Sequence, residues 1–375
     1  MMRRRSGMAL PAAIGLLATT LTTFPATAES KVRSAATTYT YVSLGWLGIP
    51  AGGPISSAQD VNSRQQAVGY SSNDRNPAAH AFQWEDGRLS AIEPIFASAE
   101  NTASAINDLG QVAGHTHVSL YEPPHAFLYR DGKSTDLGTG WGSGSGSAAT
   151  DANNKGVVVG THFRSQGSPV RAVLWQNGKL RDLGTLGGST DQQWSTESEA
   201  NAVNDKGQVV GTALPKSGYP LHGFLWQNGR MKDLGTLGGN SEATVAQDIN
   251  EKTQITGSSQ NAAGQTNAFL WEAGKMRDLG TLPGGTGSTA YGINESGQVV
   301  GTSRTSADYY GQHAFLWDNG QMIDLNTVVT NLPPDVSLEQ AQAINDEGVI
   351  VGQTCYYCEE GKTADPQAYM LIPNS

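Results

Sequence analysis

Short apolar segments recur along this chain, and each is bounded by a polar turn. Val209-Val210-Gly211 follows the turn Asn204–Gly207, and Gly223–Trp226 precedes the turn Asn228-Gly229. Most apolar positions within these segments are consecutive rather than alternating, which is typical of strands buried on both faces. No long stretch places apolar residues at helical spacing. The pattern therefore predicts an all-β protein.

The same unit returns seven times. An asparagine at the end of the first strand of each unit marks the register: Asn62, Asn107, Asn153, Asn204, Asn250, Asn294 and Asn345. Successive marks are 44 to 51 residues apart, which is the size of a four-stranded propeller blade. We name the four strands of each unit A to D, with the asparagine at the end of strand A.

Strands C and D are predicted to form a tight hairpin. Strand C, such as Ala314–Trp317, is followed by Asn-Gly or Asp-Gly, the pair that a type I′ turn favours because both central residues need positive φ. These pairs are Asp86-Gly87, Asp131-Gly132, Asn177-Gly178, Asn228-Gly229 and Asn319-Gly320. Strand D follows, as in Met231–Leu237.

The two ends of the chain indicate that the units close into a ring. The first segment, Tyr41–Gly48, is a strand D without its A, B and C, and the last, Ala368–Leu371, is a strand C without its D. An open solenoid would be expected to carry polar capping units instead. We therefore predict a seven-bladed β-propeller over residues 40–373, in which the N-terminal strand completes the last blade.

The N-terminus has the layout of a cleaved secretory signal over residues 1–28, followed by a short linker at 29–39. Arg3–Arg5 precede the apolar run Met8–Leu21, and Ala26–Ala28 supplies small residues for cleavage. We expect a secreted or periplasmic protein. Export by the twin-arginine route is an alternative that Ser6–Met8 fits poorly. No later segment approaches about 20 apolar residues, so no membrane span is expected.

Charge excludes one class of partner. The chain has 34 acidic and 24 basic residues, and removal of the signal with its three arginines moves the net charge from −10 to −13. Without a basic cluster, such a protein is a poor candidate for binding nucleic acid. We expect a monomer with no cofactor.

The repeated motifs resemble the HAF-family extracellular repeat. The resemblance rests on His80–Phe82, His125–Phe127 and His313–Phe315, together with the glycine-rich segments Asp182–Gly188 and Asp233–Gly239. It covers about Tyr41–Ile372 and implies an exported bacterial repeat protein, without a particular reaction. Two units depart from the pattern, at Leu89–Ile92 and Arg171–Val173.

The repeated histidines and aspartates are interpreted as structural pairs. A two-residue turn at Asn319-Gly320 pairs Phe315 with Asp324, so His313 and Asp324 become diagonal neighbours on one face. The same offset joins His125 to Asp136, His222 to Asp233, Arg171 to Asp182 and Asn267 to Asp278. The strand C tryptophans are assigned to the core: Trp84, Trp175, Trp226, Trp271 and Trp317.

Several motifs resemble parts of metal or phosphate sites, but each lacks residues or elements that such a site needs. Asn345–Gly348 lacks the further oxygen ligands of a calcium loop. His115 and His117 point the same way on a strand, but no third zinc ligand follows at a recognisable spacing. The glycine-rich segments are not followed by a helix that could hold phosphate. No metal site is predicted.

Cys355 and Cys358 are the two cysteines of the chain. Their spacing matches that of redox enzymes, but no βαβ unit surrounds them. In an oxidising compartment, the expectation is a local disulfide that holds a long loop.

Function is expected in the parts that do not repeat. The B–C and D–A connections are long and variable, and strand alternation places both at the same face, where binding residues concentrate on a rigid scaffold. The candidate ligand-binding residues are His115, His117, Tyr121, Trp141, His162, Arg164, Trp194, Tyr219, Tyr309 and Tyr310, with Glu197, Glu199, Glu242 and Tyr291 nearby.

Exposed aromatic rings beside charged groups suit a carbohydrate or a protein partner. The sequence therefore favours a secreted, non-enzymatic binding protein. One alternative is an extracellular polysaccharide lyase or hydrolase that uses His115, His117 or His162 with Tyr121 or Tyr309. The other is a purely structural surface repeat, which the diversity of the loops disfavours.

Overall fold

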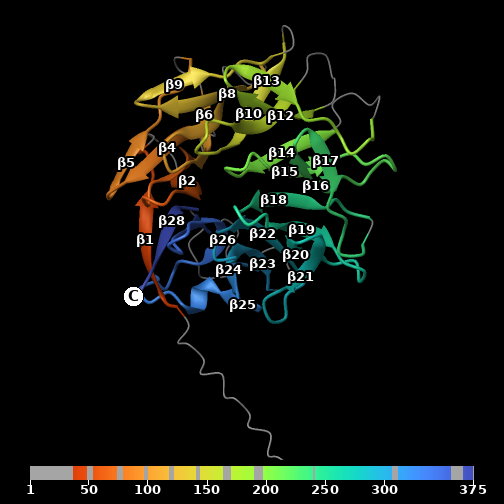
Figure 1. Ribbon diagram of the computed structural model, residues 1–375. Coiled ribbons are helices and arrows are strands. Elements are labelled where there is room, and N and C mark those ends of the chain that lie inside the picture. Colours follow the sequence, from red (N-terminus) through yellow and green to blue (C-terminus); the bar gives the residue numbers. More distant parts are fainter. Residues whose placement is uncertain are drawn as a thin grey trace, which may run out of the picture. The chain divides into compact units, whose positions relative to one another are not determined.

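The computed structural model describes residues 37–374 apart from 49–53, 74–78, 97–99, 118–121, 141–143, 164–169, 190–196, 240, 306–310 and 356–365. The predicted signal and most of the predicted linker lie outside these residues. The described chain forms seven antiparallel sheets of four strands each, with neighbouring strands in the order A, B, C, D. The predicted seven-bladed β-propeller is confirmed (Figure 1).

Six blades are built from consecutive strands. Blade 1 contains β2 (Pro54–Val61), β3 (Ala67–Asn73), β4 (His80–Glu85) and β5 (Arg88–Ala91); blade 2 contains β6 (Glu100–Ile106), β7 (Val112–His117), β8 (His125–Arg130) and β9 (Lys133–Asp136); blade 3 contains β10 (Gly146–Ala152), β11 (Val158–Phe163), β12 (Arg171–Gln176) and β13 (Lys179–Asp182). Blade 4 contains β14 (Ser198–Val203), β15 (Val209–Ala213), β16 (His222–Gln227) and β17 (Arg230–Asp233); blade 5 contains β18 (Val245–Ile249), β19 (Ile255–Gln260), β20 (Thr266–Glu272) and β21 (Lys275–Gly280); blade 6 contains β22 (Gly287–Ile293), β23 (Val299–Arg304), β24 (Gln312–Asp318) and β25 (Gln321–Asp324).

Blade 7 joins the two ends of the chain. It contains β26 (Leu338–Ile344), β27 (Ile350–Thr354), β28 (Ala368–Pro373) and β1 (Tyr39–Gly45), and β1 pairs antiparallel with β28 through contacts such as Tyr41 with Leu371. Figure 1 shows β1 in red beside β28 in blue. Ser56 of blade 1 also donates to the Gly45 carbonyl at 2.7 Å and accepts from the Ala368 amide at 2.9 Å. The N-terminal strand therefore closes the ring, as predicted.

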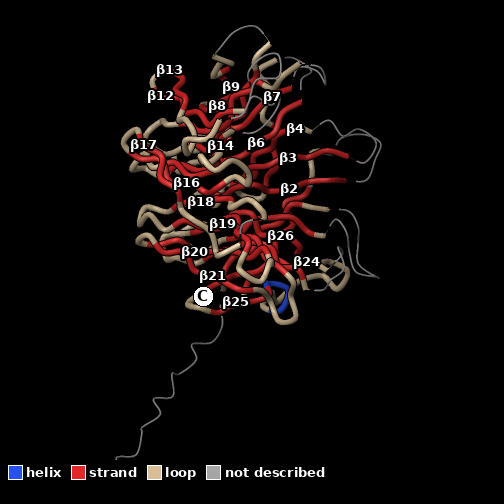
Figure 2. Tube along the Cα trace, turned by 90° about the vertical axis from the view of Figure 1, so that its right-hand side faces the viewer, coloured by secondary structure: helices blue, strands red, loops and turns tan. Residues whose placement is uncertain are grey.

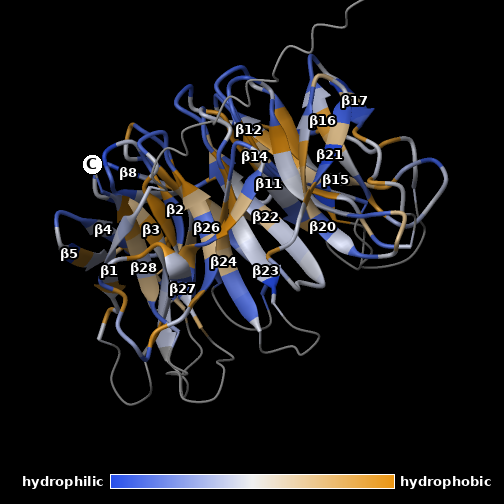
Figure 3. Ribbon diagram, turned by 90° about the horizontal axis from the view of Figure 1, so that it is seen from below, coloured by the Kyte–Doolittle hydropathy of each residue, from blue (hydrophilic) through white to orange (hydrophobic). Residues whose placement is uncertain are grey.

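The apolar runs form cores between blades. All six residues of β19 are buried, whereas β17 is largely exposed. Trp175, Trp226, Trp271 and Trp317 are buried, and Trp84 is partly buried. Figure 3 shows hydrophobic residues along the strands and hydrophilic residues at the connections. Each strand B and C is therefore covered by a neighbouring blade on each face, while strand D meets solvent.

The hairpin turns have the predicted backbone. Asn319 and Gly320 have φ of 49° and 90°, as a type I′ turn requires. Ala273, with φ of 49°, occupies the same turn position in blade 5, where the other turns have Asn or Asp. The sequence pattern did not predict a turn there.

A recurring glycine in strand B is explained by a bulge in strand A. The pairing of β14 with β15 shifts between Ala200 and Ala202, and a side chain at Gly211 would lie 2.0 Å from the Glu199 carbonyl oxygen. The same close approach occurs at Gly69, Gly114, Gly160, Gly257, Gly301 and Gly352. Only glycine fits where the bulged strand comes this close.

Helix contributes little to the described chain. Figure 2 shows strands in red, with the 3-10 helix η2 (Leu325–Thr327) in blue close to β25. Among the described residues no helix has the length and apolar character needed to cross a bilayer.

Candidate functional site

The antiparallel order of the strands places all B–C and D–A connections on one side of the ring, the loop face, and all A–B and C–D turns on the other, the turn face. A polar cavity of about 560 Å³ opens among the loop-face ends of blades 5, 6 and 7. We call it the loop-face cavity. Its lining is Glu242, Gly264, Gln265, Thr266, Thr286, Gly287, Ser288, Thr289, Tyr291, Thr302, Arg304, Gln312 and Gln340.

The loop-face cavity combines an acid, a base and a phenol. Glu242 accepts a hydrogen bond from the Thr266 hydroxyl, which joins a D–A connection to the start of strand C. Arg304 is exposed at the end of β23. Tyr291 lies where the cavity meets the central channel, and burial, together with the charge of Glu339, raises the pKa of its phenol. At neutral pH, Tyr291 is therefore a hydroxyl that can both donate and accept.

Two predicted site residues occupy the equivalent place in blade 2. His115 and His117 lie eight and ten residues after their register asparagine, as Thr302 and Arg304 do in blade 6. The rings of His115 and His117 are 5.3 Å apart, and His115 is 3.1 Å from the Thr102 hydroxyl. Burial, with the charge of His117, lowers the pKa of His115 to about 4. His115 is therefore a neutral, hydrogen-bonded imidazole at pH 7.

His162 has a different environment. Its side chain is buried in β11, and Nε2 lies 2.5 Å from the Thr139 carbonyl oxygen of the preceding connection. In blades 5 and 6 the corresponding residues are Ser259 and Ser303, whose hydroxyls accept from backbone amides of the preceding D–A connection. His162 therefore occupies the position from which Ser259 and Ser303 bond their blade to the preceding D–A connection.

The strand B residues were expected in loops, and the structure corrects this. His115 and His117 belong to β7 and His162 to β11, because strand B continues past its glycine before the chain leaves the sheet. Tyr291 likewise lies in β22 and Glu199 in β14 rather than in a connection.

Two further predicted site residues in the described parts of the chain, Tyr219 and Glu197, do not line the loop-face cavity. Tyr219 is 53% exposed and precedes Pro220 through a cis peptide bond. Glu197 is buried and binds Arg171 at 2.5 Å. Tyr121, Trp141, Arg164, Trp194, Tyr309 and Tyr310 lie outside the described residues.

The recurring polar pairs have the predicted geometry. His313 Nδ1 lies 2.7 Å from Asp324 Oδ2, and Phe315 pairs with Asp324 as the turn requires. The other pairs, His125 with Asp136, His222 with Asp233, Arg171 with Asp182 and Asn267 with Asp278, are 2.8 to 3.2 Å apart. These residues hold the start of strand C to the end of strand D.

The glycine-rich segments connect one blade to the next. The Gly188 amide donates to the Leu214 carbonyl at 3.1 Å, and the Gly239 amide donates to the Gln260 carbonyl at 2.9 Å. A side chain at Gly188 would lie 2.3 Å from a backbone oxygen. The glycines therefore permit a close backbone contact between blades, in agreement with a structural role.

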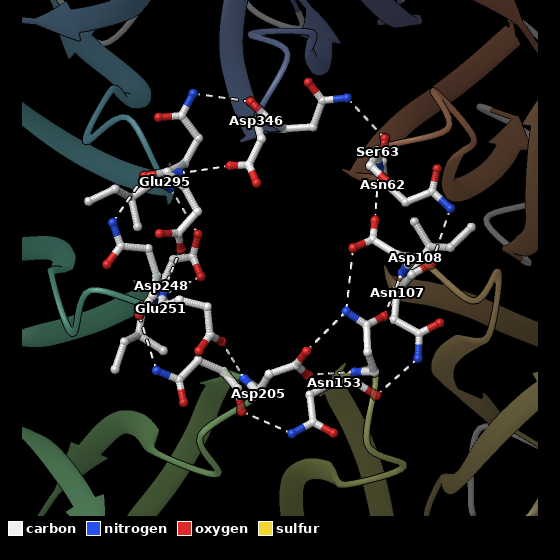
Figure 4. Close-up of a pocket in the computed structure, with 18 of the residues that line it drawn as sticks. Asn62, Ser63, Asn107, Asp108, Asn153, Asp205, Asp248, Glu251, Glu295 and Asp346 are labelled. Atoms are coloured by element: carbon white, nitrogen blue, oxygen red, sulfur yellow. Dashed lines mark hydrogen bonds between the residues drawn. The ribbon is translucent and has the colours of Figure 1, made fainter.

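The register asparagines form a closed ring around the channel. Each side-chain amide donates to the backbone carbonyl of the next asparagine at 2.9 to 3.1 Å, and Asn345 completes the circle with Asn62. Figure 4 shows part of this ring on the turn face. Each asparagine also bonds its own turn, as Asn204 does with the Lys206 amide at 3.1 Å. The repeat pattern identifies these asparagines as equivalent positions, but it does not predict that they bond one blade to the next.

Acidic side chains surround the same channel mouth. In six blades the amide of the residue after the register asparagine donates to the corresponding side chain of the next blade, as Glu295 does to Asp346 at 2.8 Å. Five of those side chains are carboxylates: Asp108, Asp205, Glu251, Glu295 and Asp346. They act as acceptors between blades.

Three further aspartates line the middle of the channel. Asp60, Asp151 and Asp248 each accept from their own following amide and from an amide of the next blade, at 2.7 to 2.9 Å. Burial raises the pKa of Asp151 to about 7 and of Asp248 to about 6, and raises that of Asp60 well above its usual value. Burial in the channel therefore favours the protonated form of all three carboxyl groups.

Cys355 is buried directly after β27. Cys358 lies outside the described residues, so the disulfide remains a prediction. No three or more histidine, cysteine, aspartate and glutamate side chains in the described parts of the chain are placed to hold a metal ion.

Neither known family profiles nor curated protein sequences match this chain. Solved structures do. A puromycin-hydrolysing peptidase from Mycobacterium tuberculosis is 12% identical with a TM-score of 0.53, over 84% of this chain and 52% of the peptidase. TolB from Acinetobacter baumannii (12% identity, TM-score 0.41) aligns over 88% of this chain and 66% of its own, and the SapL1 lectin (13%, 0.39) over 74% and 95%. The chain spans about half the peptidase, and this similarity concerns the fold: a seven-bladed β-propeller.

Proposed function

We propose that this protein is a secreted, non-enzymatic binding protein that recognises a carbohydrate through its loop face. The observation that carries the proposal is the loop-face cavity, in which Glu242, Tyr291 and Arg304 lie among amide and hydroxyl side chains. Carbohydrates present many hydroxyl groups, each of which both donates and accepts. A lining with carboxylate, guanidinium, amide and phenol groups supplies both kinds of partner.

The position of the loop-face cavity supports this assignment. Its residues come from three blades, and strands such as β22 and β23 hold several of them in fixed places. A rigid site loses little conformational entropy when a ligand binds, which favours recognition of a small polar molecule. The cavity volume also lies within the usual range for small-ligand sites.

Export is part of the proposal and rests on the sequence. Residues 1–28 have the layout of a cleaved signal, and the resemblance to the HAF-family extracellular repeat implies the same location. We expect the mature chain to be a monomer in the periplasm or the medium.

The enzymatic alternative has less support. A lyase or hydrolase built on His115 or His162 needs an imidazole that reaches substrate, but His115 is bound to Thr102 and His162 is buried against Thr139. Neither lines the loop-face cavity. His117 is the remaining histidine candidate.

A glycan array with the mature chain tests the proposal, followed by a product assay on every ligand found. Arg304→Gln is expected to weaken binding about tenfold or more, because it removes a charged donor. Arg88→Gln, on exposed β5 of blade 1, is the matched control and should bind normally. Ligand turnover would favour the enzyme. Binding of a protein without any glycan, or glycan binding that Arg304→Gln leaves intact, would contradict the assignment.

A further inference from the structure

A second cavity lies between blades 3 and 4, at their turn-face ends. It has a volume of about 440 Å³. We call it the cationic cleft. Its base is apolar, with Val157 and Leu174, and its outer part carries Gln176 and Asn177. Lys179, Leu180, Arg181, Gly207 and Trp226 complete the lining.

Arg181 is held in place by the neighbouring blade. Its guanidinium carbon lies 4.8 Å from the centre of the Trp226 ring, a cation–π geometry. A Cβ at Gly229 would be 3.1 Å from Arg181 Nη2, so the hairpin tip of blade 4 leaves just enough room for the guanidinium. Arg181 is exposed, and none of the hydrogen bonds or ion pairs among the described residues uses its side chain. Trp226 and the hairpin tip of blade 4 thus hold the Arg181 guanidinium in place, and its N–H groups can donate to a ligand.

The equivalent cleft between blades 5 and 6 has acidic side chains that the cationic cleft lacks. Arg277 lies over Trp317 at 5.0 Å in the same arrangement. There, however, Glu272 and Asp318 join the lining, and Gln254 donates to Glu272 at 2.9 Å. The positions of Gln254 and Glu272 are taken by Val157 and Gln176 in the cationic cleft.

The charge of the cleft is therefore opposite to that of the chain. Two basic and no acidic side chains line it, whereas the whole chain has a net charge of −10. A planar guanidinium recognises a carboxylate with two parallel hydrogen bonds. The amides of Gln176 and Asn177 can bond hydroxyl groups, while Val157 and Leu174 can contact an apolar ring face.

We propose that the cationic cleft binds a carboxylate-bearing sugar, a uronic acid, with Arg181 and Lys179 on the carboxylate. This site is separate from the loop-face cavity, and its existence does not depend on the proposed function. It would allow the protein to hold an acidic polysaccharide on the turn face as well.

The test is a titration of the mature full-length chain with galacturonate and its short oligomers, followed by NMR, with galactose as the neutral counterpart. Arg181→Gln is expected to weaken uronate binding about tenfold or more. Added salt should weaken uronate binding by the parent protein, because it screens the charges involved. Arg277→Gln, in the equivalent cleft, is the matched control and should leave it unchanged.

Three results would overturn the proposal: no uronate binding, equal binding of galactose, or equal losses in Arg181→Gln and Arg277→Gln. Binding of a short peptide through its terminal carboxylate, with no uronate binding, would also reject the sugar. Arg304→Gln separates the two sites, since it should leave uronate binding at Arg181 intact.

Discussion

The side-chain amide of Asn345 donates a 2.9 Å hydrogen bond to the carbonyl oxygen of Asn62, which lies 283 residues earlier in the chain. The same side chain accepts from the Val349 amide at 2.8 Å. One residue thus joins the last blade to the first and fixes its own turn. Both partners are backbone groups that the rest of the ring keeps from water.

Asn345→Ala is expected to destabilise the fold by about 1–3 kcal/mol, because the Asn62 carbonyl and the Val349 amide would lose their buried partner. The measurement is urea unfolding followed by tryptophan fluorescence. Gln321→Ala, at an exposed position of β25, serves as control and should unfold like the parent. An unchanged midpoint in Asn345→Ala would show that the asparagine ring contributes nothing to closure.

The channel aspartates predict an unusual pH dependence. Since the pKa of Asp151 is about 7 and that of Asp248 about 6 in the folded chain, against about 3.9 when unfolded, the folded state binds more protons. Their contribution to stability is therefore complete below about pH 4 and is lost as pH rises through 6 to 7.

Urea midpoints at pH 4.5, 6 and 7.5 test this directly. The parent should lose stability across the series, and Asp151→Asn should lose less because its side chain no longer ionises. Identical slopes in the two proteins would contradict the raised pKa.

Asp324 acts in the opposite sense: burial favours its neutral form, but hydrogen bonds and charge from His313 lower its pKa overall. Its contribution is present above about pH 4 and lost at lower pH.

Substitution of His313 separates hydrogen bonding from charge. Asn267 already bonds Asp278 at 3.0 Å in the equivalent place, so His313→Asn should retain most of the stability. His313→Leu removes the donor from a half-buried carboxylate and should cost about 1–2 kcal/mol. Thermal unfolding at pH 7 compares the two. Equal losses would mean that the pair adds only packing.

Ala273 offers a stabilising change. It is the non-glycine residue of the β20–β21 turn and has φ of 49°, a conformation that asparagine tolerates better than alanine. Ala273→Asn should raise the free energy of unfolding by about 0.5–1 kcal/mol. The same change at exposed Ala263, whose φ is not positive, should have no such effect. A decrease at Ala273 would refute the explanation.

The predicted disulfide can be checked by mass. Cys355 and Cys358, if joined, leave the purified mature chain two mass units lighter than its reduced form and unreactive towards iodoacetamide. Alkylation of both thiols without prior reduction would reject the pairing.

The sequence was sufficient for the fold because local geometry decides it. A two-residue turn fixes which residues of strands C and D face each other, so the contact of His313 with Asp324 followed from counting. Ring closure followed from the strands left over at the two ends. The bulge opposite Gly211 was not visible, since nothing in the pattern of apolar residues marks an inserted residue.

The candidate sites were harder to predict, because they are assembled across blades. Glu242 precedes strand A of blade 5 and Arg304 ends strand B of blade 6, and the packing of these two blades brings them to one cavity. Asp151 resembles a surface residue in the sequence, and its burial depends on strand A lining a narrow channel. The positive charge of the cationic cleft depends on the residue that ends strand C, which is Gln176 in blade 3 but Glu272 in blade 5. The repeat pattern does not distinguish these two residues.

The channel aspartates also divide the ring unequally. Asp60, Asp151 and Asp248 lie in blades 1, 3 and 5, and each bonds the blade that follows. The corresponding residues elsewhere are Ala105, Ala202, Gly292 and Ala343. Aspartate thus occurs in every second blade, and this alternation cannot continue around a ring of seven blades. The channel aspartates therefore link blade 1 to 2, blade 3 to 4 and blade 5 to 6, whereas blade 7, which both chain ends build, is joined to its neighbours through the asparagine ring instead.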